Sequence, residues 1–471
     1  MVLQSVNPAT EEVLETFEEF TPRQVDTALQ QAHEAFRRWR TTSYSQRAAG
    51  LQAAARILRQ QKARYAELIT AEMGKPITEA EAEVEKCAWN CEFYADNGAK
   101  FLADEPVQTS AERSYVAYEP LGVVLAIMPW NFPFWQAIRF AAPALMAGNG
   151  ALLKHAPNVP RCALAIEQVF REAGFPEGLF RTVLVGATAT AAISQQLIDD
   201  ERIRAVTLTG SDRAGSQVAA AAGRALKKTV LELGGSDPFV VLADANLPAA
   251  AELAARSRFQ NTGQSCIAAK RFIVVEAVAE EFEQRFREAV ARLPVDDPRK
   301  RDTRIGPLAR ADLRDNLERQ VQASVAHGAR VVLGGRRLPT RGYFFEPTIL
   351  TGVDPQLPVF REETFGPAAA VIRAKDEEAA LDLANDSVYG LGASIWTRDL
   401  ERGQRLARQV ESGAVFINGM VASDPRLPFG GVKRSGYGRE LAAVGIREFT
   451  NIQAIWVALS EQPIADAPPT E

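Results

Sequence analysis

Short runs of β-branched residues alternate with helix-like stretches over most of the chain after residue 121. The first strand candidates are "GVVLAI", "GALLKH", "RTVLVG" and "AVTLTG", and the predicted helices between them cover 136–147, 161–174 and 188–200. A second set of candidate strands and helices begins at residue 229. Such alternation is typical of parallel βαβ units. The pattern predicts an α/β protein with two lobes joined near 229–236.

Residues 21–102 lack this alternation and predict a series of helices instead. Thr21 followed by Pro22 is typical of a helix N-terminus, and the apolar residues that follow recur at helical spacing. Gly98 is the predicted end of the last helix in this series. Cys87 and Cys91 share one face of that helix, so we expect them to pack in a core rather than to act in redox chemistry.

Composition excludes several functional classes. A length of 471 residues suits two or three domains, and a net charge of -5 without a basic stripe does not indicate a nucleic-acid partner. The four cysteines form no Cys-x-x-Cys pair, which favours a reducing compartment, and three histidines are a poor supply of metal ligands. Stretches 121–130 and 136–153 are interrupted by Pro, Gly or Arg, and the N-terminus has no apolar signal region. We expect a cytoplasmic protein that uses no membrane and no metal.

Cys266 follows a run of small and polar residues in "FQNTGQSCIAAKR". A thiol reacts as its thiolate, and Gly263 together with the small residues around the thiol would leave it accessible. The alternative is a buried structural cysteine, which is commoner in proteins. From this stretch alone, both interpretations stay open.

Glu232 and Asn131 are two further candidates for catalysis. Glu232 ends a predicted strand in "LELGG", where burial would raise its pKa towards that of a general base. A solvated turn glutamate is the alternative. Asn131 in "MPWNFPFW" follows another strand, and its amide could donate to an oxyanion. The alternative for Asn131 is a cap of the next helix.

Several strand ends carry residues that suit a nucleotide. "TLTGSDRAG" resembles a phosphate-binding turn that opens a helix, although it is not the Gly-x-Gly-x-x-Gly pattern. The carboxyl ends of parallel strands are where ligands bind in such sheets. In "EETFGP" an acid and an aromatic residue would suit a ribose and a ring, and a surface turn fits equally well. The residues concerned are Gly210, Ser211, Gly215, Lys154, Glu363 and Phe365.

Taken together and in this order, the motifs resemble those of the NAD(P)-dependent aldehyde dehydrogenase superfamily. The matching pieces are "PWNFP", "LLK", "GS" followed by Gly215, "LELGG", "NTGQSC", "EETFGP" and "PFGGVKRSGYGRE". They extend the resemblance over about residues 5–457. Among known branches, the chain is most similar to bacterial succinate-semialdehyde dehydrogenases.

The resemblance implies a role for each matching residue. Cys266 would form a thiohemiacetal with the aldehyde, and the Asn131 amide with the Cys266 N–H would hold the oxyanion. Hydride would pass to the nicotinamide, and Glu232 would activate water to hydrolyse the resulting thioester. The expected cofactor contacts are Trp130, Asn131, Lys154, Gly210, Ser211, Gly215, Leu233, Glu363 and Phe365.

The resemblance also implies the fold and the assembly. A Rossmann-like cofactor domain would comprise 1–103 and 121–232, followed by an α/β catalytic domain at 233–425. Segments 104–120 and 445–460 would form a small β-arm for oligomerisation. We expect a homodimer or a homotetramer.

The cofactor preference is predicted from one position. Family members often have a glutamate three residues after the strand-end lysine, where it binds the adenosine 2′-OH. Here that residue is Pro157, which would not repel a 2′-phosphate, while Lys154 and the adjacent His155 are available near it. This favours NADP, with NAD as the alternative.

The substrate prediction depends on Arg139 and Ser423. Succinate-semialdehyde dehydrogenases have an arginine at the offset of Arg139, where it binds the distal carboxylate, and Ser423 would add a hydrogen bond. A second arginine found in some of them is Gln260 here, and a second cysteine is Ala268. We therefore predict no redox switch at the nucleophile. A structural ion pair is the alternative role for Arg139.

Other functions stay open as alternatives. Another aliphatic or aromatic aldehyde is the main one within enzymes, and a CoA-acylating relative would commonly lack the glutamate found at Glu232. A catalytically retired structural or binding member of the family is the non-enzyme alternative. Retention of both Cys266 and Glu232 favours an enzyme.

Overall fold

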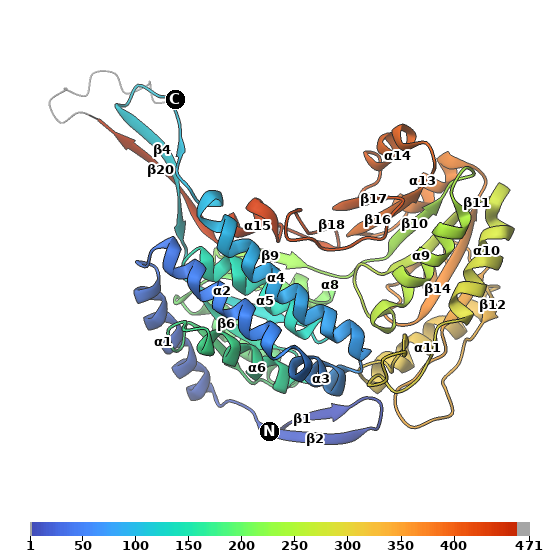
Figure 1. The fold of residues 1–471 in the computed structure, drawn as a ribbon, viewed down its shortest axis with the longest axis horizontal. Coiled ribbons are helices and arrows are strands. Elements are labelled where there is room, and N and C mark those ends of the chain that lie inside the picture. The colour runs from blue at the N-terminus through green and yellow to red at the C-terminus, as the bar shows by residue number, and fades with distance from the viewer. Residues whose placement is uncertain (1, 459–471) are drawn as a thin grey trace.

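The computed structural model describes residues 2–458 and has two lobes with a projecting arm (Figure 1). The chain begins with a small hairpin of β1 (Val2–Asn7) and β2 (Glu12–Glu18) at the edge of the N-terminal lobe. The first lobe contains a six-stranded sheet and the second a seven-stranded sheet. The α/β fold class predicted from the strand–helix alternation is confirmed.

The first sheet has the strand order β19-β9-β8-β5-β6-β7. All pairings are parallel except that of β19 with β9. Sequence order reverses between β5 and β8, as in a Rossmann fold, and ligands bind at the carboxyl ends of strands beside such a reversal. The strands are β5 (Val123–Met128), β6 (Gly150–His155), β7 (Phe180–Val183), β8 (Ile203–Thr209), β9 (Lys228–Glu232) and β19 (Gly436–Tyr437).

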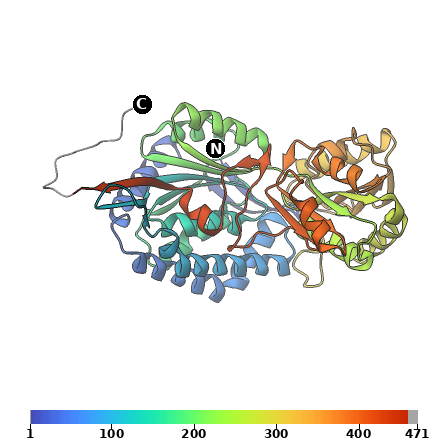
Figure 2. The same ribbon diagram turned by 90° about the horizontal axis from the view of Figure 1, so that it is seen from above.

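Helices cover both faces of this sheet (Figure 2). One face packs against α1 (Pro22–Trp39), α7 (Thr190–Asp199) and α8 (Asp212–Arg224). The other packs against α5 (Pro133–Met146) and α6 (Pro160–Glu172), which are covered in turn by α2 (Tyr44–Gln60), α3 (Lys62–Met73) and α4 (Ile77–Phe101). The apolar side chains that face the sheet in this way account for the helical periodicity in the sequence.

The N-terminal helices confirm one predicted boundary and correct another. Thr21 caps α1 with a capping box, and Pro22 is its first residue. Gly98, however, lies inside α4, which continues to Phe101. A Cβ at Gly98 would lie 2.4 Å from the Met146 side chain, so the glycine permits a close helix contact instead of ending the helix. Cys87 and Cys91 are buried in the core, as expected.

The second sheet has the order β12-β13-β14-β11-β10-β16-β17 and is parallel except for β12 with β13. Its strands are β10 (Asp237–Val241), β11 (Ala269–Val275), β12 (Arg330–Leu333), β13 (Thr348–Thr351), β14 (Ala368–Ala374), β16 (Gly392–Trp396) and β17 (Ala414–Ile417). One face packs on α9 (Leu247–Phe259) and α10 (Glu276–Ala291). The other packs on α11 (Ala311–Ala326), α12 (Pro358–Arg361), α13 (Glu377–Asn385) and α14 (Leu400–Ala407).

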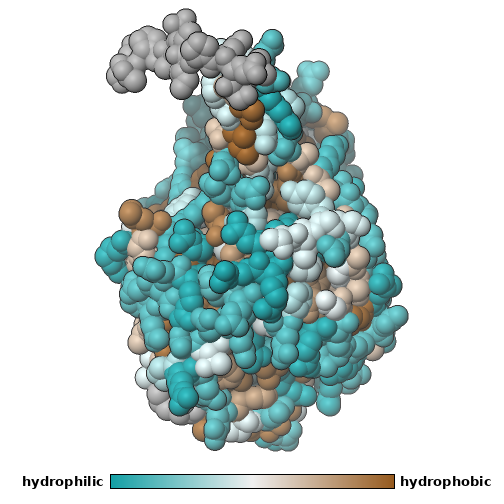
Figure 3. Space-filling view, turned by 90° about the vertical axis from the view of Figure 1, so that its left-hand side faces the viewer, coloured by the Kyte–Doolittle hydropathy of each residue, from teal (hydrophilic) through white to brown (hydrophobic). Residues whose placement is uncertain are grey.

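The arm is a three-stranded antiparallel sheet of β3 (Glu105–Pro106), β4 (Arg113–Pro120) and β20 (Thr450–Val457). It projects from the first lobe, and apolar residues are visible on it in Figure 3. Ile452 is 62% exposed and Trp456 57% exposed. Exposed apolar residues of this size on a protruding edge are typical of a surface that another chain covers.

The remaining elements connect the lobes. A bridge of β15 (Tyr389–Gly390) with β18 (Val432–Lys433) precedes β19, and α15 (Ala442–Arg447) leads into β20. Through β19 the chain returns to the first sheet after completing the second, a crossing that none of the predicted domain ranges includes. Residues 459 and 460 of the predicted arm lie outside the described residues. The domain division stays a prediction.

Candidate active site

The segment before Cys266 has an unusual backbone. It follows α9 as a short 3-10 turn at Gln260–Gly263, in which Asn261 has φ 52°, Thr262 φ 56° and Gly263 φ 73°. Left-handed conformations are unfavourable for residues with a Cβ and persist where the surroundings hold them. The Asn261 amide donates to the backbone oxygen of Asn131 at 2.8 Å, and the Thr262 hydroxyl accepts from the N–H of Gly306 at 3.0 Å. The turn is therefore fixed from both sides.

Lys270 holds the other side of the nucleophile segment. Its buried Nζ donates to the backbone oxygens of Ser265 at 3.1 Å, Cys266 at 2.8 Å and Ala268 at 3.1 Å. It also lies 3.7 Å from Oε1 of Glu363. A single cation thus fixes three carbonyl groups around the thiol, a role that no sequence motif indicated.

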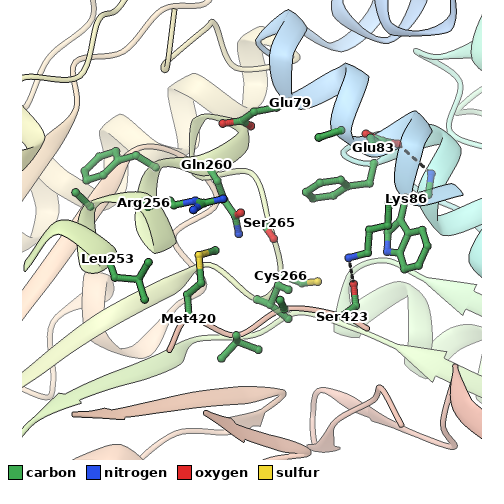
Figure 4. A pocket seen from close by; sticks show the side chains of 18 of the residues that line it. Glu79, Glu83, Lys86, Leu253, Arg256, Gln260, Ser265, Cys266, Met420 and Ser423 are labelled. Carbon is green, nitrogen blue, oxygen red and sulfur yellow. Dashed lines mark hydrogen bonds between the residues drawn. The ribbon is translucent and has the colours of Figure 1, made fainter. Parts of the chain in front are cut away.

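The Cys266 thiol is half-buried and points into a cavity (Figure 4). Burial, with the Glu232 carboxyl adding to it, raises the pKa of the thiol to about 12, while Arg139 and Lys270 act in the opposite direction. In the protein without ligands, the thiol is therefore protonated at neutral pH. Attack by its sulfur requires that this proton be transferred to a base.

Asn131 lies beside the nucleophile segment and does not cap a helix. Its Nδ2 donates to the backbone oxygen of Gln264 at 3.1 Å, and its Oδ1 accepts from Gln136 at 3.2 Å. The N-cap of α5 is Phe132, so the alternative role for Asn131 is wrong. An amide has two N–H donors, and one of them is still available. The backbone N–H of Cys266 has no acceptor among residues 2–458, so two donors are available for an oxyanion.

Glu232 is the last residue of β9 and is 2% exposed. Neither carboxyl oxygen forms a hydrogen bond within the described part of the chain, although the Gly431 backbone is near enough to favour the ionised form slightly. Burial raises the pKa of Glu232 to about 8; Arg139 opposes this shift and Glu440 adds to it. A solvated turn glutamate is excluded. An unpaired buried carboxyl group with such a pKa is suited to general-base chemistry near neutral pH.

Arg139 forms the structural ion pair that was its alternative role. Its Nη2 lies 2.5 Å from Oε2 of Glu440 and donates to the Thr209 hydroxyl at 3.3 Å. Burial raises the pKa of Glu440, and Arg139 opposes that rise. Glu440 is the last residue of "PFGGVKRSGYGRE", but no local pattern indicates that it lies near Glu232 and Arg139.

The cavity in front of Cys266 has a volume of about 960 Å³. Arg139 and Ser423, the two predicted substrate residues, both line it. Gln260 also lines it. At this position, where some succinate-semialdehyde dehydrogenases were expected to have an arginine, the cavity therefore has an uncharged side chain. Apart from Cys266, the other predicted site residues do not line this cavity; Glu363 and Phe365 belong to the second lobe, and most of the others follow strands of the first sheet.

Those residues gather at the carboxyl ends of the strands where the sheet order reverses. Trp130 follows β5, Lys154 is near the end of β6, and Gly210 with Ser211 follows β8. Lys154 is 5% exposed and has no hydrogen-bond or ion-pair partner among the described residues; burial lowers its pKa to about 8. Ser211 caps α8 by accepting from Ala214. An unpaired buried cation at one strand end and a helix N-terminus at another both suit a phosphate group.

The opposite side of this crevice is formed by the second lobe and the segment after β9. A Cβ at Gly215 would lie 2.5 Å from the Leu233 side chain, so this glycine is needed for close packing. The N–H of Gly235 donates to Glu363 at 3.0 Å, and the rings of Phe365 and Trp130 meet edge to face at 5.7 Å. The residues present fit a dinucleotide between the two lobes.

His155 and Pro157 were both predicted to contact the cofactor, and the structure bears on His155 only. The ring of His155 is buried, with Nε2 3.0 Å from the Pro133 oxygen and Nδ1 accepting from Ala156 at 2.8 Å. Burial lowers the pKa of His155 to about 4. Both ring nitrogens are occupied and the ring is neutral, so this geometry contradicts the prediction that His155 contacts a phosphate. Pro157 lies in the half-buried turn between β6 and α6, and its contact with the cofactor stays a prediction.

Residues 2–458 contain no group of three His, Cys, Asp or Glu side chains that could hold a metal ion. Within the same residues, every helix is too short or too polar to cross a membrane.

Comparison with known proteins gives the same family throughout. Residues 1–455 match the profile described as the aldehyde dehydrogenase family. A probable succinate-semialdehyde dehydrogenase [NADP(+)] of Synechocystis is 53% identical over 97% of this chain and 100% of its own length. A succinate semialdehyde dehydrogenase [NAD(P)+] of Escherichia coli K12 is 50% identical over 96% of this chain and 97% of its own length.

A solved structure shares the fold over nearly the whole chain. The succinic semialdehyde dehydrogenase of Streptococcus pyogenes, in complex with NADP+, has a TM-score of 0.94 and 38% identity to this chain, covering 97% of it and 100% of the other chain. The fold expected from the motifs is thereby confirmed.

Proposed function

The chain belongs to the aldehyde dehydrogenase family, and we propose that it oxidises succinate semialdehyde to succinate with NADP as the hydride acceptor. The observation that carries the chemistry is that three distant parts of the chain meet at the thiol: the Asn131 amide donates to the Gln264 oxygen, two residues before Cys266, and the Glu232 carboxyl is near enough to raise the pKa of the thiol. The names of the Synechocystis and E. coli relatives support the substrate and the cofactor.

In this proposal the sulfur of Cys266 adds to the aldehyde carbon, and the thiol proton is released to solvent water, so that Glu232 stays ionised for the later step. The free N–H of the Asn131 amide and the Cys266 backbone N–H bind the oxygen that becomes negative. NADP, when bound, supplies a nicotinamide that takes the hydride. A thioester on Cys266 is left, and its carbonyl oxygen stays in the same pair of donors.

Glu232 then acts as the base for hydrolysis. It takes a proton from water as the water attacks the thioester carbon; the bond to sulfur breaks and succinate leaves. Burial raises the pKa of Glu232 into the working range of a base, while Arg139 favours the ionised form and Glu440 opposes it. The retention of this base is what separates hydrolysis from acyl transfer to CoA.

The residues proposed to hold NADP are those of the crevice between the lobes. Lys154 would pair with a phosphate, Glu363 with a ribose hydroxyl, and Gly210 and Ser211 would face the pyrophosphate at the start of α8. Pro157 places no acid near a 2′-phosphate. These features favour NADP over NAD.

Assembly and location are part of the same proposal. The apolar arm would be covered by a second copy of the chain, giving a homodimer or homotetramer. All four cysteines are free, which suits a reducing compartment such as the cytoplasm.

The test is a substrate panel with both cofactors. We expect the highest kcat/KM with succinate semialdehyde and NADP, compared with butanal, benzaldehyde and NAD, and no oxidation by Cys266→Ala. A succinate semialdehyde value no higher than that for butanal would overturn the substrate. A higher value with NAD would overturn the cofactor, and full activity of Cys266→Ala would overturn the mechanism.

A further inference from the structure

Lys86 extends from α4 into the cavity that contains Cys266 (Figure 4). Its Nζ donates to the hydroxyl of Ser423 at 2.7 Å and lies 4.5 Å from the centre of the Trp135 ring. The side chain is thus held on two sides, by a hydroxyl and by an aromatic face. Figure 4 shows the Cys266 thiol pointing towards this pair.

The acids nearest to Lys86 are already paired with other cations. Glu83 forms an ion pair with Lys75 and also accepts from the N–H groups of Phe134 and Trp135. Asp424 lies 2.6 Å from Arg426. Within residues 2–458, Lys86 has no carboxylate within ion-pair distance. It is therefore a cation that faces the cavity without an anionic partner.

Three other cations line the cavity, and each lies near an acid. Burial raises the pKa of the Glu79 carboxyl, and Arg256 and Arg304 act to lower it. Arg139 is paired with Glu440, so the two together carry little net charge. Gln260 lines the same cavity and is neutral. A substrate with a carboxylate would need an unpaired positive charge in the pocket, because a buried anion without a partner is strongly unfavourable.

We propose that Lys86, together with Ser423, binds the distal carboxylate of the aldehyde substrate and so determines the preference for an acidic aldehyde. An ammonium group has three N–H donors, and Ser423 uses one of them. The Ser423 oxygen accepts that bond, which leaves its own O–H free to donate. Two N–H groups and one O–H group therefore converge on the same space, as a carboxylate requires.

This inference rests on the proposed function and names the residues that recognise the substrate. It differs from the sequence-based prediction, which gave the carboxylate to Arg139. In the structure Arg139 is better described as a positioning residue that holds Glu440 near Glu232. Lys86 is the specificity-determining cation.

The charge on Lys86 gives a readout that a merely structural role would not. Burial lowers the pKa of Lys86 to about 8, and Arg139 on α5 adds to this. Cys87 and Glu83 on its own helix and Asp424 on the 418–431 loop act in the opposite direction. A carboxylate binds the protonated form. The KM for succinate semialdehyde should therefore be constant below pH 8 and rise above it, while the KM for neutral butanal should not follow Lys86.

The experiment compares three variants of the full-length protein. Lys86→Met removes the charge but keeps an unbranched chain against Trp135, and Lys86→Arg keeps the charge. Arg256→Met is the matched control, because Arg256 is a cation that lines the same cavity beside Gln260, on the other side of Cys266 in Figure 4. KM and kcat are measured for succinate semialdehyde and butanal between pH 6.5 and 9.5.

We expect Lys86→Met to raise the KM for succinate semialdehyde on the order of 10- to 100-fold, the value of a hydrogen-bonded charge, and to remove its rise above pH 8. Its KM for butanal and its kcat should stay near those of the wild type. Lys86→Arg should restore most of the affinity and move the rise to higher pH. Arg256→Met should change neither substrate selectively.

The outcomes separate this inference from the proposed function. If the wild type prefers succinate semialdehyde and Lys86→Met keeps both that preference and the pH profile, the inference is wrong and the function stands. If the wild type shows no preference over butanal, both are wrong. If Lys86→Met raises the KM for both aldehydes equally, Lys86 has a structural role and the inference is wrong. If Arg256→Met raises the KM for succinate semialdehyde as selectively as Lys86→Met does, the overall charge of the cavity decides binding and the inference is again wrong.

Discussion

Replacing Glu232 by glutamine tests the base of the proposed hydrolysis, because it removes the carboxylate and keeps the shape. Burial raises the pKa of Glu232 to about 8. At pH 7 roughly a tenth of the protein then has the ionised base. Where hydrolysis limits turnover, the wild-type kcat should rise about tenfold from pH 7 to a plateau above about pH 9.

The Glu232→Gln variant should lose both the rate and this pH dependence. General-base catalysis contributes about 10²- to 10⁴-fold, so steady-state turnover should fall at least about 100-fold. Hydride transfer depends on Cys266 and the two oxyanion donors. A first burst of about one NADPH per active site should therefore remain, and rapid-mixing absorbance between pH 6.5 and 9 measures burst and turnover together.

Two results would refute this reasoning. Loss of the burst would place Glu232 before hydrolysis, and an unchanged steady-state rate would remove it from the mechanism. Glu448→Gln is the matched control, because Glu448 pairs with Lys228 at 2.9 Å near the start of the same strand, β9. The control should leave burst, turnover and pH profile as in the wild type.

Three further changes test the nucleophile segment and the arm. Lys270→Met leaves three buried carbonyl groups without their cation and should lower the free energy of unfolding by about 3 kcal/mol, measured in urea; an unchanged midpoint would contradict it. Gly263→Ala puts a Cβ 2.3 Å from the Gly366 oxygen at a φ of +73°, so a loss of at least about 2 kcal/mol is expected, and a smaller loss would show that the turn relaxes. Ile452→Lys should convert the proposed oligomer to monomers in light scattering after gel filtration, and an unchanged mass would remove the arm from the interface.

Some of the fold could be predicted from the sequence because the signals are local. Thr21 and Pro22 mark the start of α1 by their own hydrogen bonds and geometry. Strand–helix alternation predicted both sheets, but β13 (Thr348–Thr351) is too short and too close to Pro347 and Gly352 to stand out. The helix end predicted at Gly98 was wrong, because in sequence a glycine that allows a close helix contact cannot be told from one that ends a helix.

The candidate site divides in the same way. Cys266 and Glu232 lie in recognisable stretches, whereas Lys86 is one charged residue among many on α4, and Glu440 gains its meaning only from Arg139, about 300 residues earlier. His155 lies next to Lys154 in sequence, yet the alternation of a strand directs its ring to the opposite face. Contacts between distant segments, which no local pattern records, decide these roles.

The pairing of β19 with β9 has a consequence for how the protein is made. Five strands of the first sheet are complete once the ribosome has passed residue 232, but the sixth comes from residues 436 and 437. The same segment supplies the Ser435 oxygen that accepts from Leu233 at 3.0 Å. A nascent chain therefore carries its thiol long before the edge beside Glu232 is closed. Because the closing strand is among the last parts translated, a truncated product lacks a finished water-activating site.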